Sequence, residues 1–126
     1  MKIEKNLEKL VLEFYFKTEI DIAITDIEKI IYYMGDTQKC VDYLYQEVSS
    51  ELKSFFQTNK KNNLLTNEQV IPIIKNGSKD FACQMIYHVE LINKLILFNK
   101  KEGLFSKEET SYIQSFMYLI EKFFKE

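Results

Sequence analysis

The residue types that most often carry catalysis are scarce in this chain. His88 is the only histidine, and the cysteines are Cys40 and Cys83. A nucleophile triad needs a serine or cysteine near a histidine that an acidic group orients. On a helical wheel His88 lies between Phe81 and Leu95, which favours a core histidine bonded to the backbone. We therefore expect no catalytic residue and no enzyme activity, and an enzyme that uses His88 with a cysteine or carboxylate is the third of three hypotheses.

Known metal-binding patterns are missing from the sequence. A helical di-iron site needs Glu-x-x-His, but Met85 occupies the position three residues before His88. There is no Cys-x-x-Cys, no pair of histidines and no calcium loop of the Asp-x-Asp-x-Asp-Gly kind. We expect no metal, no other cofactor and no small-molecule substrate.

Phosphate cradles and paired carboxylates also have simpler explanations. The Asn-Gly-Ser-Lys segment 76–79 lacks the second glycine and the Lys-Ser/Thr pair of a P-loop, so it predicts a turn followed by a helix cap. Glu108 and Glu109, like Asp26 and Glu28, fall at predicted helix starts, where the helix dipole favours acidic groups.

The charge balance gives weak support to nucleic-acid binding. The chain has seventeen lysines, no arginine and nineteen acidic residues, for a net charge of −2. Arginine is the usual residue for bidentate contacts with phosphates and bases, and lysine supplies only a point charge. A small helical subunit of a nucleic-acid-associated complex is therefore the second hypothesis. Its contact residues would be Lys60, Lys61, Lys75, Lys79, Lys100 and Lys101.

The elements that would position these residues are predicted to be helices. The 126 residues, 46% of them hydrophobic, suit a single domain spanning 1–126 with a packed core. Apolar residues recur at three- and four-residue spacing through most of the chain. The predicted helices cover about 3–17, 18–34, 37–58, a short stretch from Thr66, 79–101 and 107–125, and one continuous helix over 3–34 fits nearly as well.

Two stretches decide the predicted fold class. The alternation of Ile20, Ile22 and Ile24 also allows a short strand, but no partner strand is evident, so we favour a helix. Residues 79–101 are apolar nearly all round, which is typical of a helix at the middle of a fold. We therefore expect an all-α, compact bundle of five or six helices around residues 79–101, closed by a helix whose start has a capping box, Ser106 with Glu109.

The C-terminal part of the chain resembles a known family. Residues 76–125 read as a turn, a nearly all-apolar helix, a short loop and an amphipathic helix. This layout resembles the central hairpin of Bcl-2-like proteins, especially the short, divergent ones of poxviruses. Asn76 and Gly77 are adjacent, without the Trp and Arg of the family's Asn-Trp-Gly-Arg signature. The resemblance implies an all-helical fold that binds a partner's helix in a groove, and no site residue is carried over from it.

A surplus of aromatic residues favours protein binding as the first hypothesis. Aromatic side chains are enriched in the cores of protein interfaces. We expect a non-catalytic domain that acts as an inhibitor, adaptor or regulator by docking on another protein or on a second copy of itself. The predicted contact residues are Tyr15, Tyr32, Tyr33, Tyr43 and Tyr45.

The composition also suggests a setting for the protein. Cys40 and Cys83 sit in apolar stretches, which is typical of free thiols in a reducing compartment. No secretory signal and no run of eighteen apolar residues is evident, so we expect a cytoplasmic protein that does not contact a membrane. The abundance of Lys, Asn and Ile without Arg suggests an AT-rich genome, such as that of a low-GC bacterium, a phage or a large DNA virus.

Overall fold

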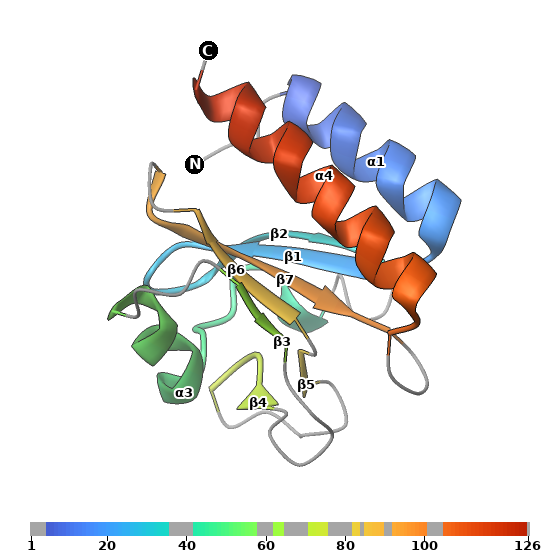
Figure 1. The fold of residues 1–126 in the computed structure, drawn as a ribbon. Helices are drawn as coiled ribbons and strands as arrows, with labels where there is room; N and C mark the ends of the chain where they lie inside the picture. The colour runs from blue at the N-terminus through green and yellow to red at the C-terminus, as the bar shows by residue number, and fades with distance from the viewer. Residues whose placement is uncertain are drawn as a thin grey trace.

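The computed structural model describes residues 5–35, 42–57, 62–64, 71–75, 82–83, 85–89, 92–100 and 105–125. Within them, a five-stranded antiparallel sheet with strand order β2-β1-β7-β6-β3 forms the centre of the fold (Figure 1). The helices are α1 (Lys5–Thr18), α3 (Ser50–Lys53) and α4 (Lys107–Lys125), with a 3-10 helix, η1 (Ser54–Gln57). The strands are β1 (Asp21–Thr25), β2 (Ile30–Met34), β3 (Asn62–Leu64), β4 (Ile71–Pro72), β5 (Ala82–Cys83), β6 (Met85–Val89) and β7 (Lys94–Asn99).

The predicted all-α bundle is wrong, because the stretch expected to be its central helix contains strands β5, β6 and β7. All five residues of β6 are buried, as are five of the six in β7. A strand covered on both faces is apolar on both, so it gives the same unbroken pattern as a buried helix. The helical hairpin implied by the resemblance to Bcl-2-like proteins is therefore also wrong.

The predicted helix over 18–34 is wrong as well. The alternation of Ile20, Ile22 and Ile24 marks strand β1, which contains Ile22 and Ile24. Strand β2 is its partner, and the two strands are antiparallel. Thr18 ends α1 instead of capping a new helix: its hydroxyl donates to the Phe14 carbonyl (2.9 Å) and accepts from the Ile20 N–H (3.2 Å). One continuous helix over 3–34 is excluded for the same reason.

Asp26 makes the turn of this β1–β2 hairpin and does not start a helix. Its Oδ1 accepts the backbone N–H groups of Glu28 and Lys29, each at 2.8 Å. Burial raises the pKa of this carboxyl group, but the two N–H groups together with the Lys94 and Lys29 charges outweigh burial and hold the pKa of Asp26 below its ordinary value. A short polar side chain that bonds the backbone two residues on is a common turn device.

The helices predicted at 3–17 and 107–125 are confirmed as α1 and α4. They lie side by side over one face of the sheet (Figure 1). They are antiparallel, because Lys17 near the end of α1 lies over the Tyr112 ring near the start of α4. The buried residues of the two helices are Leu7, Val11, Phe14, Ile113, Phe116, Met117 and Ile120. They pack on one face of the sheet, against Ile22, Ile24, Met85, Tyr87, Val89, Ile96 and Phe98.

A second core lies on the opposite face of the sheet. There Leu52 of α3 and the segments around Tyr43, Val48 and Ile73 pack on Ala23, Ile30, Ile86, Leu95 and Leu97. The helix predicted over 37–58 is not continuous: Ser50–Gln57 are helical, but Glu47 and Val48 bridge to Lys29 and Ile74 as short strand segments, and residues 37–41 and 58 lie outside the described residues. The predicted short helix from Thr66 and the turn at 76–79 lie outside the described residues.

Candidate functional site

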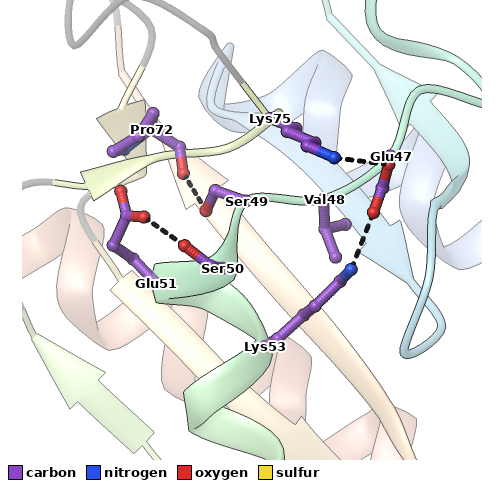
Figure 2. A pocket seen from close by; sticks show the side chains of 8 residues that line it. All are labelled: Glu47, Val48, Ser49, Ser50, Glu51, Lys53, Pro72 and Lys75. Carbon is purple, nitrogen blue, oxygen red and sulfur yellow. Dashed lines mark hydrogen bonds and ion pairs between the residues drawn. The ribbon is translucent and has the colours of Figure 1, made fainter.

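A polar hollow lies beside α3 and has a volume of about 490 Å³. Figure 2 shows its side chains, which come from the segment before α3, from α3 itself, and from β4 and the chain after it. The Ser49 hydroxyl donates to the Pro72 carbonyl (2.6 Å) and accepts the Leu52 N–H (3.1 Å). The hollow is lined by Glu47, Val48, Ser49, Ser50, Glu51, Lys53, Pro72 and Lys75.

Three of the four charged groups of this hollow bind one another, and the fourth, Glu51, accepts the Ser50 hydroxyl at 2.8 Å. Glu47 pairs with Lys53 at 2.9 Å and with Lys75 at 3.6 Å, and the Lys53 hydrogen bond is the main cause that lowers the pKa of Glu47. Backbone bonds from Ser49 N to Ile73 O and from Lys75 N to Glu47 O join the same two segments. These contacts join the segment before α3 to the chain after β4. The lining has two acidic residues and two lysines, so its net charge is zero.

His88 is in β6 and contacts Phe56, which packs against the second core. Its Nε2 is 3.2 Å from Asn93 Oδ1, and Phe56 meets its ring edge to face at 5.5 Å. Its buried Nδ1 has no hydrogen-bond partner among the described residues. Asp21 shares this face of the sheet, but His88 pairs with Leu95 and Asp21 with Asn99. Four residues along β7 place the two roughly 13 Å apart along the strand direction alone, and β7 also lies between their strands, so they are too far apart for an acid–histidine dyad.

No metal centre is found in the part of the chain that the structure describes. Nowhere in it do three histidine, cysteine, aspartate or glutamate side chains come together to hold an ion. Cys83 is in β5, and Cys40 lies outside the described residues.

The structure places the five predicted contact tyrosines in different surroundings. Tyr33 and Tyr43 are buried in the second core, where their rings meet at 5.5 Å and the Tyr33 hydroxyl donates to Asp21 (3.0 Å). Tyr32 is half-buried on the opposite face of the sheet, and Tyr15 is half-buried on α1. Tyr45 is 66% exposed and lies under the Lys29 ammonium group. These residues do not form one surface.

Two of the six lysines predicted to contact nucleic acid, Lys75 and Lys100, lie within the described residues. Lys75 contacts Glu47, and Lys100 binds Glu109 at 2.6 Å. The other four residues, Lys60, Lys61, Lys79 and Lys101, lie outside the described residues.

An apolar groove runs between α1 and α4 on the side away from the sheet. It has a volume of about 230 Å³. Both helices line it at positions i, i+3, i+4 and i+7, which lie on one side of a helix. The lining residues are Leu10, Glu13, Phe14 and Lys17 of α1 and Tyr112, Ser115, Phe116 and Leu119 of α4. A second hollow of about 430 Å³ adjoins it and adds Gln114 and Tyr118, and we call these ten residues the helix-pair face.

Exposed apolar side chains mark this face. Tyr118 is 67% exposed and Leu119 is 48% exposed, and Phe16 is 77% exposed on α1 without lining either hollow. Large apolar groups left in water on adjoining helices are typical of an interaction surface. The chemistry that this arrangement supports is the burial of another apolar surface.

The groove is held in place by contacts between the two helices. The rings of Phe14 and Phe116 meet at 4.6 Å and form its floor. The start of α4 is fixed by the predicted capping box: Glu109 N donates to Ser106 Oγ (3.1 Å), and Ser106 N donates to Glu109 Oε1 (2.9 Å). This part of the sequence prediction is confirmed.

Sequence reasoning missed Leu10, Tyr118 and Leu119 as surface candidates. It assigned the apolar residues of 107–125 to one buried stripe, and Tyr118 and Leu119 fall beside that stripe. The sequence does contain a signal for them. Apolar residues are spread round a wider arc of the helix than one face of a sheet can cover, which predicts that some of them stay exposed on the outer side.

Comparisons with known proteins give no relative for this chain. No protein-family model matches it, and the search of curated proteins also found no match. Among the helices of the described residues, none has the length and apolar character needed to cross a membrane.

Proposed function

We propose that this chain is a non-catalytic protein-binding module, which acts as an inhibitor, adaptor or regulator by docking through its helix-pair face. The occupant is an amphipathic helix of a protein partner. One observation supports this most directly: Tyr118 and Leu119 are exposed beside an apolar groove whose lining repeats at helical spacing on both walls. An amphipathic helix that lies in such a groove buries apolar residues at the same spacing.

The rest of the described chain favours this proposal over the other hypotheses. In the polar hollow beside α3, Glu47 pairs with both lysines and Glu51 accepts the Ser50 hydroxyl, while His88 is 8% exposed with an asparagine and a phenylalanine beside it. Lys75 and Lys100 are already paired with acids, so no specific observation favours nucleic-acid contact. The proposed setting is the reducing cytoplasm, since Cys40 and Cys83 sit in apolar stretches typical of free thiols.

Photo-crosslinking in living cells tests the proposal. Leu119 is replaced by p-benzoylphenylalanine in one variant, and Ile27 is replaced in a matched control. Ile27 is 52% exposed in the β1–β2 turn, outside the helix-pair face. We expect an adduct from position 119 and none from position 27, with the crosslinked peptide carrying apolar residues at helical spacing.

A second substitution ties the adduct to the groove. Leu10→Glu places a carboxylate on the opposite wall and should abolish the adduct at 119, while circular dichroism shows that the fold is kept. Equal crosslinking from both positions, or an adduct that survives Leu10→Glu, contradicts docking at this face.

A further inference from the structure

We infer that the helix that docks on the helix-pair face is α4 of a second copy of this chain, in an antiparallel two-fold dimer. The inference rests on the proposed function and names its partner. A two-fold interface requires a surface that is complementary to itself. The outer side of α4 meets that requirement in both charge and shape.

Charge sets the direction of the pairing. Glu108 and Lys122 are both exposed, and they lie seven residues before and seven residues after the exposed Ser115. When two antiparallel copies cross at Ser115, Glu108 of each copy faces Lys122 of the other. A parallel pairing would instead set Glu108 against Glu108 and Lys122 against Lys122, which repel each other.

Side-chain size fits the same register. Ser111, four residues before Ser115, faces the partner's Leu119, four residues after it. Tyr112 likewise faces the partner's Tyr118. Small serines let two helices approach closely, and the leucine and tyrosine side chains fill the space on either side.

The charges within the groove do not oppose this pairing. Glu13 and Lys17 are the charged residues of the groove lining, and they cancel. Antiparallel helices also place opposite dipole ends beside each other. The stretch from Glu108 to Lys122 spans about 21 Å at 1.5 Å per residue, so the contact follows nearly the full length of α4.

Sedimentation equilibrium of the full chain tests the dimer through a charge swap. Glu108→Lys and Lys122→Glu each place like charges at both ends of the interface, so each should raise the dimer Kd about ten-fold. The double variant restores opposite charges and should return the Kd to near the unsubstituted value. Lys9→Glu, an exposed charge reversal on α1 outside the face, is the matched control and should leave the Kd unchanged.

Leu119→Glu gives a second, independent variant. Leu119 is 48% exposed, so the substitution should yield a folded monomer, with folding checked by circular dichroism. An unsubstituted chain that stays monomeric overturns the inference. So does a dimer that ignores Leu119→Glu, or a charge swap without recovery in the double variant.

The crosslinking result separates failure of this inference from failure of the proposed function. A monomer whose position 119 gives an adduct with a different protein leaves the helix-pair face as a docking site and removes only the self-pairing. A monomer that gives no adduct at 119 removes both.

Discussion

Gly35 lies directly against the carboxyl group of Asp21, and a β-carbon at Gly35 would overlap that group. Asp21 begins β1, and Gly35 follows the last residue of β2, so the two residues continue the antiparallel pairing of Ile22 with Met34. Asp21 is only 6% exposed and accepts the Tyr33 hydroxyl at 3.0 Å. Glycine at position 35 therefore allows the end of the β1–β2 hairpin to pack against the buried Asp21 carboxyl group.

Adding a methyl group at this contact should destabilise the protein. We expect Gly35→Ala to lower the free energy of unfolding by about 1–3 kcal/mol, because Asp21 or the end of β2 must shift to make room. Urea denaturation measures the change. The matched background is Asp21→Ala, where the overlap is gone and Gly35→Ala should cost much less. Equal costs in the two backgrounds would show that Asp21 is not the group that Gly35 accommodates.

The outer helices were predictable from the sequence because each obeys one pattern. A surface helix buries a single stripe, so the buried residues of α1 and α4 recur at three- and four-residue spacing. Ser106 and Glu109 add a start signal that works through local hydrogen bonds alone. Such signals do not depend on the rest of the fold.

The central strands were not predictable in the same way. The residues of β6 and β7 are apolar on both faces because helices cover one face and the second core covers the other. That covering comes from distant segments, so the local sequence alone shows only an unbroken apolar run. The local signs of a hairpin are few. Val89 in β6 is β-branched, which favours a strand, and Asn93 before β7 is a residue type that tolerates the left-handed backbone it adopts here (φ 50°).

The site was partly hidden for a related reason. Tyr33 and Tyr43 are part of the second core, which exists only because the chain forms a sheet. Leu10 and Leu119 lie on opposite walls of a groove, and the antiparallel docking of α1 on α4 brings them together. Tyrosine content predicted an aromatic surface, but which aromatic residues reach the surface depends on the tertiary fold.

Phe98 should be one of the most costly side chains to remove. It is fully buried in β7, and the rings of Phe14, Tyr87 and Phe116 surround it at 5.8, 5.9 and 6.0 Å. We expect Phe98→Ala to lower the free energy of unfolding by about 3–5 kcal/mol, since it removes a large buried group that joins both helices to the sheet.

Chemical denaturation with Ile27→Ala as the control checks this prediction. Ile27 is 52% exposed and lies outside the helix-pair face, so its truncation should change the free energy of unfolding by no more than about 0.5 kcal/mol. Similar losses for the two variants would argue against the buried aromatic cluster.

The capping box should make a measurable contribution to α4. Ser106→Ala removes the acceptor for the Glu109 N–H, and we expect a loss of about 1 kcal/mol in the free energy of unfolding. Ser111→Ala, an exposed serine within the same helix, is the control; both variants are measured in the Leu119→Glu background, where the dimer contact of Ser111 is absent, and Ser111→Ala should then have no such cost. A loss of the same size at Ser111 would point to a general effect of serine replacement instead of the cap.

The pH dependence of stability should follow the carboxyl groups whose pKa is lowered by folding. The hydrogen bond from Lys100, together with the Ser106 N–H, holds the pKa of Glu109 below its ordinary value of 4.5. The folded pKa is thus below the unfolded one, so Glu109 stabilises the fold fully above the unfolded pKa. That contribution is lost as the pH falls through the folded pKa.

Unfolding free energies measured from neutral pH down into the acid range check this for Glu109. We expect the acid loss of stability to be smaller in Glu109→Gln, because glutamine keeps the neutral capping contact with Ser106 but has no charge for Lys100. Lys100→Met should also flatten the acid range, since it removes the first cause of the lowered pKa. The double variant Glu109→Gln with Lys100→Met is the control and should match Glu109→Gln, since either substitution alone already removes the ion pair. A Glu109→Gln profile parallel to that of the unsubstituted chain would show that the Lys100–Glu109 pair does not couple folding to protonation.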